Sequence, residues 1–232
     1  LRSDRWPGAD FWEQQGRKGI TLEGIIDSCD VIDIGVDGGG LDDLLGFAVI
    51  GRHAKTREWL AGCMAHAHPS VLERRKQEAA RFNDFSNDGD LVLVKRIGDD
   101  VQDIAEICAQ IEASGKLDKI GVDPAGVGGI VDGITQAGVP QDKVIGVSQG
   151  WRLGGSIKTA ERKLAEGGLL HNGSAMMAWC VGNAKVEPRG NSILITKQAS
   201  GNSKIDPLMA LFNAVSLMAL NPASEKSFWD EE

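Results

Sequence analysis

Two aspartates of this chain stand where a carboxylate could do chemistry. Asp37 ends a β-branched run that begins at Val31, and Asp123 ends a second apolar run that contains Ile120 and Val122. Three glycines follow Asp37 directly, and a glycine-rich segment follows Asp123 after Pro124 and Ala125. A carboxylate at the tip of a buried strand, beside a turn without side chains, can be approached closely by a metal ion or a phosphate. These two positions therefore predict a site for one of those ligands.

The first of these stretches also has a plainer interpretation. The segment from Asp30 to Gly51 holds two apolar runs joined by a turn, which is typical of a central β-hairpin. Asp and Gly are ordinary turn residues, and this stretch taken alone favours a hairpin with an acidic turn. The same order of strand, aspartate and glycines recurs at Asp123, and we interpret the recurrence as similar chemistry rather than as an internal repeat.

A third aspartate opens the last helical pattern of the chain. Asp206 stands where an N-cap belongs and Pro207 where the first helical residue belongs. The apolar face of this helix is Leu208, Leu211, Phe212, Val215 and Met218. The plain interpretation of Asp206 is a helix cap. If the strands that end at Asp37 and Asp123 are neighbours, and this helix starts at the same edge, Asp206 completes a cluster of three carboxylates.

Such a cluster needs cations, because like charges raise one another's pKa and favour protonation. Mg²⁺ or Mn²⁺ would satisfy it with carboxylate oxygens and waters as ligands. Two such ions about 3.5–4 Å apart activate a water and stabilise the leaving oxygen of a phosphodiester. The predicted chemistry is two-metal phosphodiester hydrolysis, with Asp37, Asp123 and Asp206 as catalytic residues and metal ligands.

The elements that position these residues follow an α/β pattern. Antiparallel strands open the chain, and strands then alternate with helices. The expected strands are 31–36, 44–50, 57–66, 91–94, 120–122, 143–147 and 193–196, and the expected helices are 69–85, 99–113, 157–170, 175–184 and the one from 206 onward. We expect an α/β fold with one mixed β-sheet, helices packed on both faces, and the Asp37 and Asp123 strands side by side.

Composition excludes several other classes of protein. The chain has 232 residues, of which 42% are hydrophobic and 25% charged, which suits one large globular domain. Four scattered cysteines without a C-x-x-C pair argue against a zinc site and a disulfide framework: Cys29, Cys63, Cys108 and Cys180. We interpret them as reduced thiols in or near the core, and His66-Ala-His68 as a loop feature rather than a metal site.

Charge and hydropathy limit the kinds of partner that we expect for this chain. A net charge of −8 counts against tight autonomous DNA binding, although a local basic groove remains compatible with it. Candidates for holding DNA phosphates are Lys158, Arg162 and Lys163 on one helix, together with Lys204; for each alone a solvated position is the plainer interpretation. No apolar run approaches the ~20 residues that span a bilayer, so we expect an intracellular protein without a membrane partner.

Four motifs follow one another along the chain. They are Gly-Val-Asp37-Gly-Gly-Gly-Leu-Asp-Asp43, Ile-Gly-Val-Asp123-Pro-Ala-Gly-Val-Gly-Gly, Ser-Gln-Gly-Trp-Arg-Leu and Lys-Ile-Asp206-Pro-Leu-Met-Ala. In order and spacing they resemble the nuclease domain of the large terminase subunit of tailed bacteriophages. The resemblance implies a ribonuclease H-like fold and cutting of concatemeric viral DNA during genome packaging. It also implies that Asp37 bridges two metal ions, that Asp123 and Asp206 complete the site, and that Asp43 is an auxiliary metal ligand.

The resemblance covers about residues 30–222, with 1–29 expected as a lead-in or linker and 223–232 as an acidic tail. It implies double-stranded DNA, a packaging ATPase domain, a small terminase subunit and a portal as partners. The expected location is the host cytoplasm and, transiently, the procapsid. No G-x-x-x-x-G-K-[ST] motif occurs, so motor activity is not assigned, and the missing initiator Met suggests a piece of a longer protein.

Two other functions remain open at this point. A phosphotransferase of the actin and sugar-kinase type also places an Asp-x-Gly turn after its first strand, but it needs two such domains, which 232 residues barely supply. A non-catalytic docking domain of the same fold is the second alternative. ATP binding would favour the former, and loss of the three aspartates from element ends would have favoured the latter.

Overall fold

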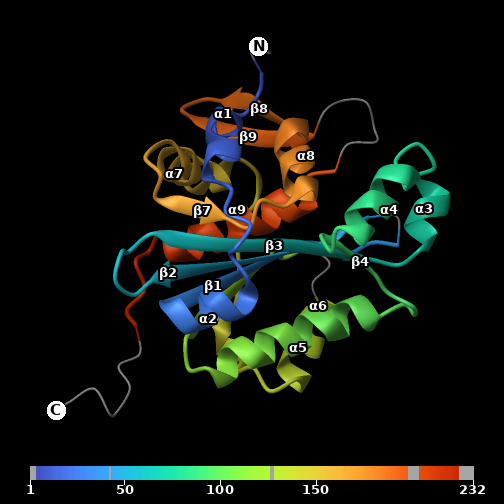
Figure 1. Ribbon diagram of the computed structural model, residues 1–232, viewed down its shortest axis with the longest axis horizontal. Coiled ribbons are helices and arrows are strands. Elements are labelled where there is room, and N and C mark those ends of the chain that lie inside the picture. The colour runs from blue at the N-terminus through green and yellow to red at the C-terminus, as the bar shows by residue number, and fades with distance from the viewer. Residues whose placement is uncertain (1–3, 42, 126–127, 198–203, 225–232) are drawn as a thin grey trace.

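The computed structural model describes residues 4–41, 43–125, 128–197 and 204–224. A mixed sheet runs through the middle of the described part of the molecule, with strand order β4-β3-β2-β1-β5-β6 and with β7 paired to β3 (Figure 1). Its strands are β1 (Cys29–Gly38), β2 (Leu45–His53), β3 (Trp59–Ala67), β4 (Leu91–Leu93), β5 (Leu117–Val122), β6 (Val144–Gly146) and β7 (Leu169–His171). A separate hairpin pairs β8 (Ala184–Arg189) with β9 (Ser192–Lys197).

The register of the sheet brings the predicted strand ends together. Strands β1, β2 and β3 form an antiparallel meander, whereas β5 lies parallel to β1 with Val36 opposite Val122. Asp37 and Asp123 therefore leave neighbouring strands at the same level and at the same edge. The predicted adjacency of these two strands is confirmed.

Helices cover both faces of the sheet. Helices α2 (Leu22–Ser28), α5 (Asp99–Ala113) and α6 (Gly128–Gln136) lie on one face, and α7 (Gly154–Ala165), α8 (Ala175–Asn183) and α9 (Asp206–Met218) lie on the other (Figure 1). Shorter elements are α1 (Ala9–Trp12), α3 (Ser70–Arg74), α4 (Ala79–Asn87) and the 3₁₀ turns η1 (Glu13–Gln15), η2 (Gln141–Lys143) and η3 (Gly150–Leu153). The predicted α/β class, a mixed sheet with helices on both faces, is confirmed.

Alternation along β1 assigns the two faces. Ile32, Ile34 and Val36 pack into the hydrophobic cluster that includes helix α5. Gly35 faces the opposite way, toward helix α9. Since side chains alternate along a strand, Asp37 shares the α9 face with Gly35. Asp206, which opens α9, and Asp37, the last residue but one of β1, are thus on one side of the sheet.

Several expected elements differ in extent. The single helix expected over 69–85 is two short helices, α3 and α4, with Arg75 in a non-helical conformation between them. The helix expected to reach Leu170 ends at Ala165, because Gly167 has a positive φ of 75° and the chain then enters β7. The strand expected over 143–147 is the short strand β6, which forms the edge of the sheet and leaves Ile145 exposed.

The first residues pack into the body of the molecule instead of trailing from it. Trp6 is fully buried, with its ring centroid 5.2 Å from that of Phe212 in α9. Trp12 stacks on His171 with 3.9 Å between centroids. The expected linker character of 1–29 therefore does not hold for these residues, while the partition of the chain into domains stays a prediction. Residues 225–232 of the expected tail lie outside the described part.

Candidate active site

Helix α9 rests directly on the backbone of the sheet, because glycines lie beneath it. A Cβ added at Gly35 would stand 1.9 Å from the carbonyl oxygen of Ala210. At Gly46 of β2 it would stand 2.6 Å from the carbonyl carbon of Asp206. Only residues without a side chain permit so close an approach. The glycines of β1 and β2 thus determine how near Asp206 lies to the end of β1.

A buried asparagine fixes the helix against the strand. Asn213 is fully buried, and its Nδ2 donates to the carbonyl oxygen of Val36 at 3.0 Å. Its Oδ1 accepts from Nε2 of Gln149 at 2.8 Å. Sequence reasoning missed both residues, although one polar residue on the otherwise apolar face of a helix was an available signal. Asn213 joins α9, the residue before Asp37 and the segment after β6.

Asp206 does not cap helix α9. The residue in the N-cap position is Ile205, and no side-chain capping hydrogen bond is formed there. Asp206 is the first helical residue, and Pro207 follows it within the first turn. The buried Oδ2 of Asp206 has no hydrogen-bond partner. The cap interpretation is therefore wrong. A capping role would have given this oxygen a hydrogen bond, but it is buried and unpartnered at the edge of the sheet where β1 ends.

The neighbouring acids perturb one another. Burial, followed by the charges of Asp123 and Asp43, raises the pKa of Asp37 to about 7. Burial and then Asp43 raise the pKa of Asp206 well above its ordinary value, and Asp37 adds to the effect. Asp123 is half-buried, and its Oδ1 accepts from the backbone N–H of Ala125 at 2.9 Å. All four predicted acids therefore belong to one electrostatic cluster.

A lysine enters this cluster from within the protein. Lys204 is 1% exposed and forms an ion pair with Oδ1 of Asp43. Burial alone would raise the pKa of Asp43, but the hydrogen bonds from Lys204 and Asp206 hold that pKa below its ordinary value. The predicted DNA contact of Lys204 does not fit this position, because a side chain so deeply buried cannot reach a phosphate in solution.

The oxygen atoms of these acids are the kind of ligand that a hard divalent cation prefers. The four acids offer carboxylate oxygens alone, one of them unpartnered, and burial together with the neighbouring negative charges raises the pKa values of Asp37 and Asp206. Within the described ranges, no group of three or more His, Cys, Asp or Glu is arranged so that it could hold a metal ion. The acids are pre-assembled in an approximate arrangement that a bound cation would have to tighten.

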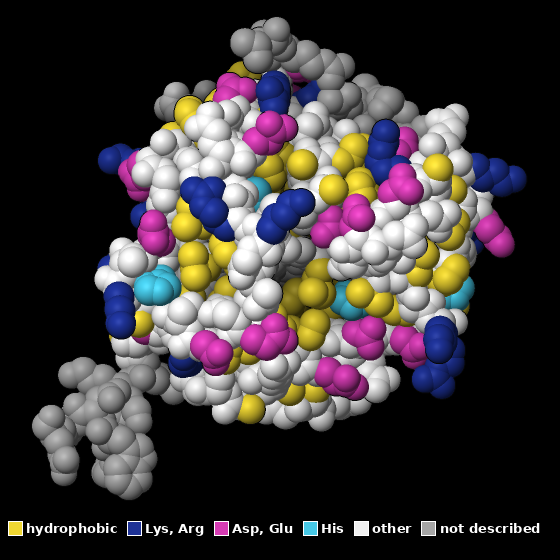
Figure 2. All heavy atoms as spheres, in the orientation of Figure 1, with side chains coloured by type: hydrophobic (Ala, Val, Ile, Leu, Met, Phe, Trp, Pro, Cys, Tyr) yellow, Lys and Arg dark blue, Asp and Glu magenta, His cyan; other side chains and the backbone are white. Residues whose placement is uncertain are grey.

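The structure does not gather the predicted cations of α7 beside these acids. Lys163 Nζ lies 5.0 Å from the ring centroid of Trp59, which begins β3 at the end of the sheet away from Asp37. Lys158 Nζ lies 3.7 Å from a carboxylate oxygen of Glu161, and Arg162 Nε lies 3.5 Å from one of Glu166. On the face drawn in Figure 2 the Lys and Arg side chains are scattered and form no single basic patch.

The other candidates raised by the sequence are structural. Among the described residues the four cysteines are buried and free, as expected of reduced core thiols. His66 is buried at the end of β3, 3.7 Å from Asp103, whereas Nδ1 of His68 lies 3.0 Å from Ser70 Oγ. The two histidines therefore have separate partners.

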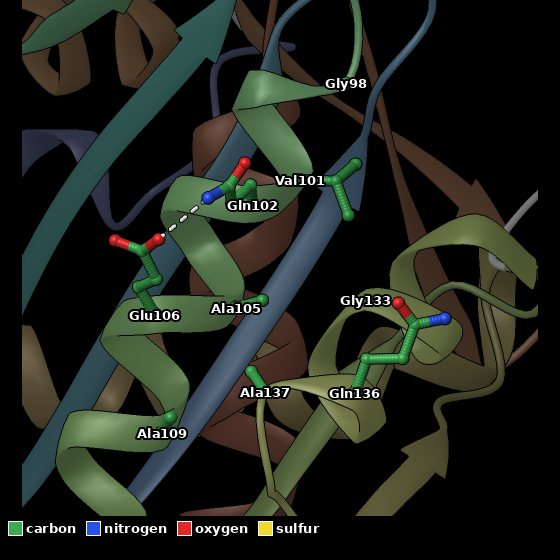
Figure 3. A pocket seen from close by; sticks show the side chains of 9 residues that line it. All are labelled: Gly98, Val101, Gln102, Ala105, Glu106, Ala109, Gly133, Gln136 and Ala137. Atoms are coloured by element: carbon green, nitrogen blue, oxygen red, sulfur yellow. Dashed lines mark hydrogen bonds between the residues drawn. The ribbon is translucent and has the colours of Figure 1, made fainter.

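A cavity of about 560 Å³ lies apart from the acids, between α5 and α6 (Figure 3). Its lining includes Ala105, Ala109, Gly133 and Ala137, and a hydrogen bond of 3.0 Å joins Gln102 to Glu106 at one side. None of the four predicted acids lines it. It lies on the face of the sheet opposite α9 and is no part of the candidate site.

A mixed sheet with an antiparallel β1-β2-β3 meander, a parallel β5 and acids at the ends of β1 and β5 defines a ribonuclease H-like nuclease fold. Residues 3–221 match the family described as terminase large subunit, endonuclease domain. The chain belongs to this family. The resemblance drawn from the four motifs is thereby confirmed, and the phosphotransferase alternative is set aside.

Solved structures agree with the fold. The large terminase of bacteriophage HK97 is 19% identical with a TM-score of 0.73 over 90% of this chain, and this chain spans 42% of that protein. The large terminase nuclease of thermophilic phage G20c with bound magnesium is 13% identical with a TM-score of 0.57, covering 93% of this chain and 98% of that one. A cobalt-bound structure of the G20c nuclease matches with a TM-score of 0.54 and 13% identity, covering 93% of this chain and 98% of that chain. No curated protein matches the chain.

Proposed function

We propose that this chain is a metal-dependent DNA endonuclease that hydrolyses phosphodiester bonds at Asp37, Asp123 and Asp206, with Asp43 as an auxiliary ligand. The observation that carries the proposal is the buried, unpartnered Oδ2 of Asp206 beside two strand-terminal acids on adjacent strands. The magnesium- and cobalt-bound G20c structures support divalent cations as cofactors. When bound, two Mg²⁺ or Mn²⁺ ions would activate a water and stabilise the leaving oxygen.

Each acid would contribute from a different element. Asp37 lies at the end of the central strand, and the charges of both Asp123 and Asp43 act on it, so it would be the central ligand of the site. Asp123 approaches from β5, and Asp206 from the α9 side of the sheet. The core fixes the strand, its neighbour and the helix relative to one another, so the acids are gathered at one edge of the sheet before substrate arrives.

Lys204 has a part in this arrangement. Its ammonium group compensates one negative charge of the cluster while no external cation is bound. An incoming divalent ion would compete with it for Asp43. Lys204 would then either move aside or remain as a permanent counter-charge that limits how many ions Asp43 can help to hold.

The wider role follows from the family. We propose that the cleavage cuts concatemeric viral DNA during genome packaging, with a packaging ATPase domain, a small terminase subunit and a portal as partners. The site of action would be the host cytoplasm and transiently the procapsid. This chain spans 42% of the HK97 large terminase. The motor and assembly functions are therefore proposed only from the likeness to that longer protein. No helix of the described residues is long and apolar enough to cross a membrane.

Incubation with supercoiled plasmid tests the proposal. We expect nicking and linearisation with Mg²⁺ or Mn²⁺ and none in EDTA, and we expect Asp37→Asn and Asp123→Asn to abolish both products. Asp30→Asn is the matched control, because Asp30 lies at the other end of β1, away from the cluster. No cleavage by the folded wild-type chain with either metal would favour the docking-domain alternative. Equal cleavage by Asp37→Asn would reject the site.

A further inference from the structure

Trp151 is a large aromatic side chain held out in solvent. It is 58% exposed, whereas Trp6, Trp12 and Trp59 are buried in the core. The guanidinium carbon of Arg152 lies 5.4 Å from the centroid of the Trp151 ring. A cation beside an exposed indole is the pair of groups that nucleic-acid-binding surfaces use, with the ring for a base and the cation for a phosphate.

The backbone beneath this ring is firmly held. Ser192 Oγ donates to the carbonyl oxygen of Trp151 at 2.8 Å, and Leu153 is buried. At Gly154 an added Cβ would stand 2.2 Å from Ser192 Oγ, so the hairpin β8-β9 lies directly against this turn. Two residues earlier, Gln149 is bonded to Asn213 of α9. The exposed ring therefore stands on a rigid base, and its exposure does not come from a loose loop.

The turn lies at the edge of the sheet that carries the acids. Strand β6 is parallel to β5 with Gly146 opposite Val122, and η3 follows β6 as Asp123 follows β5. Gln149, two residues before Trp151, donates to Oδ1 of Asn213, and Nδ2 of Asn213 donates to the carbonyl oxygen of Val36, the residue before Asp37. The segment that carries Trp151 is therefore tied to the end of β1 at which the acids lie.

We propose that Trp151 and Arg152 form a contact for the DNA strand beside the scissile phosphate, with the indole stacked on a base and the guanidinium near a phosphate. The inference rests on the proposed function, since it requires DNA at the acids. A paired base inside a duplex has both faces covered, so this contact favours substrate with unpaired bases next to the cut.

Fluorescence anisotropy with labelled oligonucleotides of about 16 nucleotides tests the contact, with Ca²⁺ in place of the catalytic metals. One oligonucleotide is intact and single-stranded, and the other has the same backbone with abasic positions. We expect Trp151→Ala to weaken binding of the intact strand about tenfold and to bind both strands equally. Trp151→Phe should keep most of the preference, and Arg152→Gln should weaken both strands alike. Ile97→Ala removes another exposed apolar side chain and is the matched control.

The outcomes separate the contact from the nuclease. If the wild-type chain neither binds DNA nor nicks plasmid, the proposed function and this contact both fail. A second outcome is that the wild-type chain nicks plasmid with Mn²⁺, while Trp151→Ala binds the intact strand as tightly as the wild type. The contact alone then fails, and the exposed ring belongs to a protein partner. Additive effects of Trp151→Ala and the abasic substitution would also overturn base stacking, because stacking partners must be coupled.

Discussion

The two ends of strand β1 both hold partly buried aspartates, yet they balance the charge differently. At the start of the strand, Asp30 accepts hydrogen bonds from Arg52 and Arg57. Burial alone would raise the pKa of Asp30, but these two arginines hold it below its ordinary value. Arg52 is also bonded to Asn221 after α9. The charges at this end are compensated by the protein itself.

The other end of the strand is short of cations. Four acids lie at this end: Asp37, Asp43, Asp123 and Asp206. Among the described residues, Lys204 is the one buried cation that is paired to any of them. The same strand and the same helix α9 border both ends, so the fold does not impose the shortage. Excess negative charge at one end is what a site for external cations requires, and compensated charge at the other is what stability requires.

The largest expected effect comes from Asp206→Asn. Asn is nearly isosteric but lacks the charge that holds a divalent ion, so plasmid cleavage with Mn²⁺ should fall by orders of magnitude. Thermal stability in EDTA should stay the same or rise, because carboxylate repulsion is relieved. Full Mn²⁺-dependent nicking by this variant would remove Asp206 from the site. Combining it with Asp123→Asn should cost little more, since residues acting as a unit are not additive.

Removing the internal cation should expose the shortage directly. Lys204→Met leaves the partly buried Asp43 without its partner, and we expect a loss of about 3 kcal/mol in the free energy of unfolding in EDTA. Added Mn²⁺ should restore more stability to this variant than to the wild type, because the ion takes over the compensation. Denaturation with and without Mn²⁺ measures both. An equal loss in both conditions would make Lys204 a purely structural residue.

The compensated end should respond differently. Asp30→Asn deprives Arg52 of its carboxylate, and we expect a loss of about 2 kcal/mol in the free energy of unfolding. The loss should be identical with EDTA and with Mn²⁺, and cleavage by the folded fraction should be unchanged. A metal-dependent loss of stability here would contradict the division of roles between the two ends.

A smaller effect is expected in the pH dependence of stability. The pKa of Asp37 is raised to about 7, so between about pH 4 and pH 7 the folded chain keeps a proton that the unfolded chain has released. Stability in EDTA should therefore fall as pH rises through this window, and Asp37→Asn should remove part of the fall. Asp33, earlier in β1, has its pKa raised to about 8 by burial and Asp118, and its share should persist in the variant. The measurement is the melting temperature of the wild type and of Asp37→Asn at pH 5 and pH 8. An equal fall in melting temperature for both proteins would contradict the expectation.

The smallest effect should come from helix α7. Arg162 is largely exposed and lies near Glu166, far from the acids, so Arg162→Ala should change DNA affinity by less than about twofold. Titration at two salt concentrations detects any phosphate contact. A tenfold loss would return α7 to the DNA-binding surface for which its sequence offered candidates.

The sequence predicted those parts of the site that depend on local patterns. Strand, terminal aspartate and glycine exit are short-range signals, and they located Asp37 and Asp123 on adjacent strands. Helix α5 was predicted with the bounds that it has, Asp99–Ala113, because an apolar stripe and acidic first turn define it.

The remaining features depend on contacts between distant segments. Lys204 and Arg162 are both cations in polar surroundings, and only the packing of the chain buries one and exposes the other. Strand β8 contains Pro188, which argues locally against a strand, yet its pairing with β9 overrides this. Trp6 and Trp12 lie in a polar-looking lead-in, and their burial depends on α9 and on His171. No local pattern contains these contacts.

The glycines under α9 have a genetic consequence. A screen for loss of cleavage should find Gly35 and Gly46 as often as the aspartates, although neither glycine has an atom able to bind a metal. Any larger residue at either position must lift the helix from the sheet, since an added Cβ would meet backbone at 1.9 Å or 2.6 Å. Such alleles would look catalytic in the assay while being defects of spacing. A compensating second mutation would then arise on the sheet-facing side of α9 rather than among the acids.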